Sequence, residues 1–82
     1  MSIPYIDVKA TGLNIYRLCE ERNLTARYLQ GVFEFGSVQA IYKWWNGRCL
    51  PTIDNLVVLA AVLDVKMEDI LVVRNREIEK AV

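Results

Sequence analysis

The sequence predicts a compact all-α bundle of five short helices with an extended N-terminal arm. Three observations lead to this fold class. The chain has 82 residues, of which 54% are hydrophobic and 24% charged, which suits one small domain and is too apolar for a disordered chain. From about residue 12 onward, apolar residues recur at helical spacing, and no strand pattern occurs beyond the arm. Residues typical of helix ends divide this stretch into short segments.

The predicted arm covers residues 1–11, where Pro4 occurs and no helical period is sustained. We expect the apolar side chains of the arm to dock on the bundle; they are Ile3, Tyr5, Ile6 and Val8. The helical domain covers residues 12–73. The charged tail, residues 74–82, is expected to be either helical or frayed.

Side chains that can cap a helix N-terminus precede three of the predicted helices; they are Thr11, Thr25 and Ser37. The five predicted helices cover 12 to about 22, 26–33, 38–46, 53–63 and about 67–73. Gly47 ends the third helix, because glycine readily adopts the left-handed conformation that follows many helices. The connections between these helices are only a few residues long, which favours a bundle of neighbouring helices.

Composition excludes several classes of function. The chain has no His, which removes the commonest general base and metal ligand, and its two cysteines have no zinc-site spacing. We therefore expect no catalytic residue, no metal site and no cofactor. The longest apolar run, residues 56–63, is far shorter than the ~18–20 residues that cross a bilayer. The simplest interpretation is a cytoplasmic domain with reduced thiols that does not bind membranes.

The predicted helices around residues 25–46 carry the functional signal. Two short helices joined by a turn that contains Gly form a helix-turn-helix arrangement. The DNA major groove is about 12 Å wide and accepts one α-helix, while the preceding helix braces the reading helix against the DNA backbone. This pair of helices therefore predicts DNA binding.

Three motifs in order carry a family resemblance. They are Ile-x-x-Trp-x-x-Gly at 41–47, Leu-Pro-Thr-Ile-Asp-Asn-Leu at 50–56 and Glu-Asp-Ile-Leu at 68–71. Together they resemble the lambda-repressor/Cro-like (XRE-type) helix-turn-helix family over about residues 12–72. The resemblance implies a five-helix lambda-repressor-like DNA-binding bundle, in which the second helix supports and the third helix reads the major groove.

The resemblance also implies which side chains meet DNA. Base contacts are expected from the outward face of the third helix, at Val38, Gln39, Tyr42 and Lys43. Their chemistry suits this role, because Gln can bond N6 and N7 of adenine, Lys can reach O6 and N7 of guanine, and Val can pack on a thymine methyl. Phosphate contacts are expected from Thr25, Arg27, Ser37, Asn46 and Arg48.

The sequence also departs from the family pattern. Ala26 stands where the family often has Gln, Gln30 replaces a small Ala, and Glu34 replaces a turn Gly. A left-handed Glu34 would cost on the order of 1 kcal/mol. The turn is one residue longer than the common form, which leaves two registers open for the third helix. Trp45 replaces a usual Glu or Gln and is expected to be an exposed aromatic that packs on a partner, the tail or the DNA.

These observations predict a sequence-specific, non-catalytic DNA-binding transcriptional regulator, a repressor of the phage, mobile-element or antitoxin type. Residues 22–48 hold four basic side chains against one acidic, so a basic reading face lies within a chain of zero net charge. A homodimer on double-stranded DNA with a pseudo-palindromic operator is expected. Its two-fold contact would come from Leu71, Val72, Val73, Ile78 and Val82, unless these residues pack on their own chain. The alternative is a protein-interaction module that has lost DNA binding and uses Val38, Tyr42 and Trp45.

Overall fold

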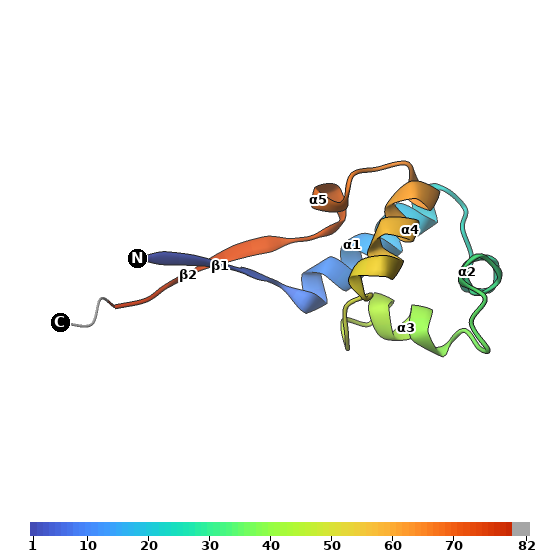
Figure 1. Cartoon of the computed structure of the whole chain (residues 1–82), viewed down its shortest axis with the longest axis horizontal. Coiled ribbons are helices and arrows are strands. Elements are labelled where there is room, and N and C mark those ends of the chain that lie inside the picture. The colour runs from blue at the N-terminus through green and yellow to red at the C-terminus, as the bar shows by residue number, and fades with distance from the viewer. Residues whose placement is uncertain (80–82) are drawn as a thin grey trace.

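The computed structural model describes residues 1–79, and in this range the chain forms five helices and a two-stranded antiparallel sheet. The elements in chain order are β1 (Ser2–Ile6), α1 (Val8–Glu21), α2 (Ala26–Phe33), α3 (Gln39–Trp45), α4 (Ile53–Leu63), α5 (Met67–Ile70) and β2 (Val73–Glu77). The helices form a bundle, and the two strands leave it together as a long ribbon (Figure 1). The ribbon gives the molecule an elongated outline of 52 × 23 × 19 Å.

The helices pack around one apolar core, as their spacing predicts. Each of the five helices contributes to it, and the buried side chains are Ile15, Leu18, Cys19, Ala26, Leu29, Ile41, Trp44, Leu56, Leu59, Ala60, Leu63 and Ile70. A non-glycine residue in the left-handed conformation follows three of the helices within two residues, with φ of 56° at Asn23 after α1, 57° at Glu34 after α2 and 56° at Asp64 after α4. The core therefore holds short helices together in spite of unfavourable backbone at their ends.

The backbones of α1 and α3 touch at Gly12. A Cβ atom at this position would lie 2.1 Å from the carbonyl oxygen of Trp44 and 2.9 Å from the amide nitrogen of Gly47. No other residue type fits there without moving one of the two helices. Gly12 therefore sets the position of α3 relative to α1.

The predicted all-α fold class is wrong, because the two ends of the chain pair as strands. β1 and β2 run antiparallel, and the register pairs Ser2 with Glu77 and Ile6 with Val73. The arm does not dock on the bundle as expected, and Tyr5 and Ile6 are exposed. The tail is neither helical nor frayed through Glu77, whereas residues 80–82 lie outside the described residues.

The pairing of the strands also changes how α1 begins. Asp7 caps the helix by accepting a hydrogen bond from the Ala10 N–H at 2.9 Å, and its second oxygen lies 2.6 Å from Nε of Arg74. Thr11, the predicted cap, lies inside α1 and is fully buried, where its hydroxyl oxygen accepts the Val72 N–H at 2.9 Å. Both side chains therefore join the start of α1 to the start of β2.

Candidate nucleic-acid interface

Helix α3 presents one polar stripe to the surface. Its exposed side chains follow helical spacing, at Gln39, Tyr42, Lys43 and Asn46. The opposite face is anchored in the core, where Ile41 is 0% and Trp44 3% exposed. The burial of Ile41 and Trp44 therefore shows the register of α3, which is the one that turns these two side chains toward the core. Val38, expected in the same outward set, precedes the helix and is half-buried against the core.

The turn before α3 is held by aromatic packing and by one amide. The rings of Phe33 and Phe35 stack at 5.2 Å, and both meet the Trp44 ring edge-on, at 5.3 and 5.8 Å. Glu34 adopts the left-handed conformation, and Nε2 of Gln30 donates to the Phe35 carbonyl oxygen at 3.2 Å. The two departures from the family pattern, at Gln30 and Glu34, thus shape the turn that orients α3.

The N-terminus of α2 lies beside α3 and has the expected cap. The hydroxyl of Thr25 accepts the Tyr28 N–H at 3.0 Å, and Arg27 is exposed in the first turn of α2. Ser37 is not the residue immediately before α3, but its hydroxyl accepts the Gln39 N–H at 3.3 Å. Both hydroxyl side chains are exposed next to amide groups of a helix start, a setting that attracts phosphate oxygens.

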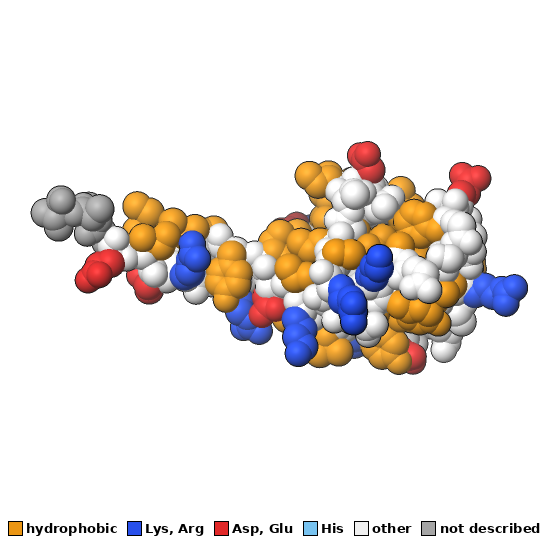
Figure 2. Space-filling view, turned by 90° about the horizontal axis from the view of Figure 1, so that it is seen from below, with side chains coloured by type: hydrophobic (Ala, Val, Ile, Leu, Met, Phe, Trp, Pro, Cys, Tyr) orange, Lys and Arg blue, Asp and Glu red, His pale blue; other side chains and the backbone are white. Residues whose placement is uncertain are grey.

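The C-terminal end of α3 supplies the remaining two predicted phosphate contacts. Asn46 and Arg48 are exposed, and the Arg48 amide bonds the Lys43 carbonyl oxygen at 2.9 Å. Figure 2 looks at the side on which α3 lies in Figure 1 and shows Lys and Arg side chains over the middle of this face, with Asp and Glu mostly near its outline. The charge distribution on this face therefore suits a polyanion.

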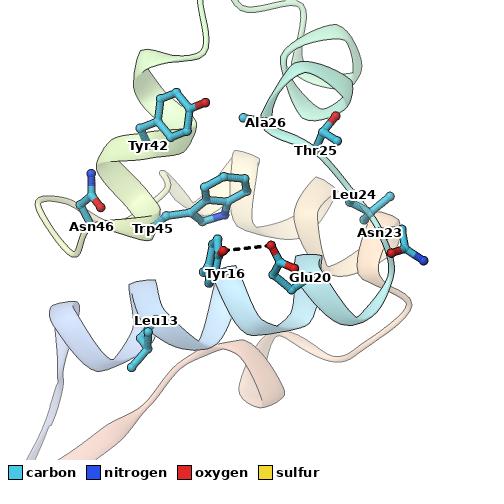
Figure 3. A pocket seen from close by; sticks show the side chains of 10 residues that line it. All are labelled: Leu13, Tyr16, Glu20, Asn23, Leu24, Thr25, Ala26, Tyr42, Trp45 and Asn46. Carbon is cyan, nitrogen blue, oxygen red and sulfur yellow. Dashed lines mark hydrogen bonds between the residues drawn. The ribbon is translucent and has the colours of Figure 1, made fainter.

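A groove of about 740 Å³ separates α1 from the start of α2 and the end of α3 (Figure 3). It is lined by Leu13, Tyr16, Glu20, Asn23, Leu24, Thr25, Ala26, Tyr42, Trp45 and Asn46. Three of the predicted DNA contacts, Thr25, Tyr42 and Asn46, thus share its wall with residues of α1. The α1 residues were not predicted as part of a site, because no motif marks them.

Trp45 occupies the middle of this groove. It is half-buried rather than an exposed aromatic, and its ring meets those of Tyr16 and Tyr42 edge-on at 5.2 and 5.7 Å. The Tyr16 hydroxyl donates to a Glu20 carboxylate oxygen at 2.9 Å, and this bond raises the pKa of the phenol above its ordinary value. Glu20 is the one charged side chain among the described residues that line the groove.

Two structural observations bear on other classes of function. No helix within residues 1–79 is long and apolar enough to span a membrane. In the same range, no group of three or more Cys, Asp and Glu side chains gathers in an arrangement that could hold a metal ion.

Comparisons with protein-family models, with curated proteins and with solved structures found no match to this chain.

Proposed function

We propose that this protein is a sequence-specific, non-catalytic DNA-binding transcriptional regulator that acts in the cytoplasm and reads the major groove with α3. The observation that carries the proposal is the polar stripe on α3, at Gln39, Tyr42, Lys43 and Asn46, on a helix whose other face is buried. A reading helix needs both properties, because its outward side chains must reach base edges from a rigid support. The resemblance to the lambda-repressor/Cro-like family supports the same role.

The parts of the interface have different tasks in this proposal. Gln39 and Lys43 donate to base edges and set the sequence preference, with Tyr42 beside them. Arg27 and Arg48 lie on either side of α3 along the chain and contact phosphates, which adds affinity without sequence information. The amide groups at the start of α2, next to Thr25, add a further phosphate contact.

A single bundle offers few basic side chains for duplex binding. We therefore propose that two copies bind a pseudo-palindromic operator, with reading helices about 34 Å apart on one face of the DNA. A regulator of this kind acts as a repressor when its operator overlaps a promoter. The phage, mobile-element or antitoxin setting predicted above belongs to this same proposal.

The alternative, a protein-interaction module without DNA binding, has less support. Of its three proposed contact residues, Val38 and Trp45 are half-buried against the core and only Tyr42 is exposed. An interaction surface needs exposed apolar side chains that lie next to one another. These three do not form one.

Selection of bound sequences from a random duplex pool tests the proposal directly. We expect the selection to yield a preferred sequence. The logarithm of its binding constant should fall linearly with the logarithm of the salt concentration, with a slope of about −0.9 for each phosphate contact. If no sequence is retained at low salt, the proposal is wrong.

Four single variants then assign the roles, with one control. Gln39→Ala and Lys43→Ala should change the preferred sequence and cost about 1–3 kcal/mol on the best site. Arg27→Ala and Arg48→Ala should weaken binding to all sequences alike and reduce the salt slope by about 1 each. Arg17→Ala is the matched control, because Arg17 lies on α1 in an ion pair with Glu21 and should leave DNA binding unchanged.

A further inference from the structure

The ribbon formed by β1 and β2 has little support from its own chain. Nine of its ten residues are exposed, and Ile3 is the half-buried exception. It also projects away from the bundle instead of lying on it (Figure 1). An isolated two-stranded ribbon is marginally stable in water, because only one row of backbone hydrogen bonds holds it. A further strand at one edge would give it the support that the bundle does not provide.

Hydrogen bonds at both ends of the ribbon show which backbone groups face outward. Met1 and Ile78 exchange bonds at 2.8 and 3.2 Å, and the Asp7 N–H donates to the Val72 carbonyl oxygen at 2.8 Å. Bonded and non-bonded pairs alternate along an antiparallel ladder. The outward N–H and C=O groups therefore belong to Ser2, Pro4 and Ile6 on β1 and to Val73, Asn75 and Glu77 on β2.

The two free edges of the ribbon are not equivalent. The β1 edge has Pro4 at its centre, and Pro has no N–H to donate to an added strand. Directly opposite Pro4, Asn75 occupies the centre of the β2 edge, and all three outward residues of that edge have both a donor and an acceptor. Within residues 1–79 no strand pairs with this edge. Only the β2 edge offers a complete template for strand addition.

We propose that a second copy of this chain adds its own β2 to this edge, antiparallel and two-fold symmetric about Asn75. This inference deepens the dimer that the proposed function includes. With Asn75 opposite its own symmetry mate, Val73 lies opposite Glu77 of the second copy, and each of the three outward pairs exchanges two backbone hydrogen bonds. The two Asn75 amides are also neighbours on one face and can bond each other. The outward backbone groups of β2 are thus complementary to those of a second β2 strand.

Charge on the opposite face decides how strong the contact is. The pairing sets Arg74 opposite Arg76 of the second copy, and like charges in this position are unfavourable. Arg74 is already compensated, because Oδ2 of Asp7 lies 2.6 Å from its Nε. The repulsion between Arg74 and Arg76 of the second copy therefore offsets only part of the stabilisation from the backbone hydrogen bonds. The resulting dimer is reversible and not obligate.

The apolar contact predicted from the sequence gives a weaker interface. Leu71 packs against its own core, and Val73 and Ile78, 56% and 36% exposed, are five residues apart on the ribbon. Val82 lies outside the described residues. Backbone pairing at the β2 edge would hold two copies together without a large apolar patch.

Asn75→Pro tests the inference without disturbing the ribbon itself. The N–H that this change removes faces away from β1, just as the nitrogen of Pro4 faces away from β2. Ser2→Pro is the matched control, since it removes an outward N–H from the β1 edge. Sedimentation equilibrium of the full chain without DNA should show a monomer–dimer equilibrium for the wild type and for Ser2→Pro. Asn75→Pro should raise the dimer Kd by about tenfold or more.

Amide hydrogen exchange gives a readout that does not depend on the variant folding well. In the wild type, the amides of Val73, Asn75 and Glu77 should become protected as protein concentration rises, while those of Ser2 and Ile6 should not. A wild type that is monomeric throughout, or a dimer that Asn75→Pro leaves unchanged, overturns the inference. A monomer that still selects a DNA half-site overturns the edge pairing alone. A β2-paired dimer without sequence preference overturns only the proposed function.

Discussion

Gly12→Ala tests how closely α1 and α3 must approach for α3 to keep its position. The added Cβ would lie 2.1 Å from the Trp44 carbonyl oxygen, where ordinary contact needs 3.4 Å or more, so the helices must separate by over 1 Å. Backbone atoms stand on both sides of the contact, so no side chain can rotate to relieve it. Alanine gains about 1 kcal/mol of helix propensity, but overpacking of this severity costs more, and we expect a net loss of about 2 kcal/mol. That corresponds to a fall in Tm of about 10 °C or more for a domain of this size.

The same substitution at Gly31 is the matched control. Gly31 lies inside α2, and a Cβ there would meet nothing within 4 Å. Gly31→Ala should therefore stabilise the protein by about 0.5–1 kcal/mol through helix propensity alone. Thermal and urea unfolding, followed by circular dichroism, measure both changes. If Gly12→Ala is as stable as the wild type, the close approach of α1 and α3 does not fix the position of α3, and the reasoning is wrong.

Two electrostatic predictions complete the set. The pKa of Asp7 is held below its ordinary value, because its carboxylate accepts the Ala10 N–H and pairs with Arg74. The stabilisation it provides is therefore complete above the pKa of the unfolded chain and is lost as pH falls through the lower folded pKa. Asp7→Asn keeps a capping oxygen but no charge, so its Tm deficit relative to the wild type should shrink toward about pH 2; a deficit that stays constant contradicts this account. Glu20→Gln removes the carboxylate from the groove beside the predicted phosphate contacts, and DNA affinity should rise several-fold at low salt and less at high salt. Glu21→Gln, outside the groove, should have a smaller effect in the same titration, and equal effects would show that only net charge matters.

The helices of the bundle could be predicted because their signals are local. Apolar spacing of three and four residues marks the buried faces, and Ile41 and Trp44 turn inward as that spacing requires. The side chain of Thr25 caps α2 as predicted. The polar stripe on α3 follows from the same periodicity, since the residues between the apolar ones face outward.

The ribbon and the groove could not be predicted because they depend on contacts between distant parts of the chain. Val73–Glu77 shows no alternation of apolar and polar residues, since neither face of the ribbon is buried, and its partner strand lies at the other end of the chain. Polar contacts follow the same rule. Arg17 pairs with Glu21 four residues further along α1, a contact that local spacing can indicate. Arg22 also lies 3.7 Å from a Glu21 carboxylate oxygen, but its Nε donates to the Leu63 carbonyl oxygen at 2.7 Å and so connects the end of α1 to the end of α4, which no local pattern indicates.

Pairing the first strand with the last also has a kinetic consequence. The ladder closes a loop that contains every helix, so its formation carries the largest chain-entropy cost in the fold. The helices and their core contacts are nearer in sequence and can form first, whereas the ribbon forms last and opens first. The β2 edge proposed to pair with a second copy can therefore open and close while the bundle stays folded. Self-association and DNA reading would then be lost and regained on separate timescales.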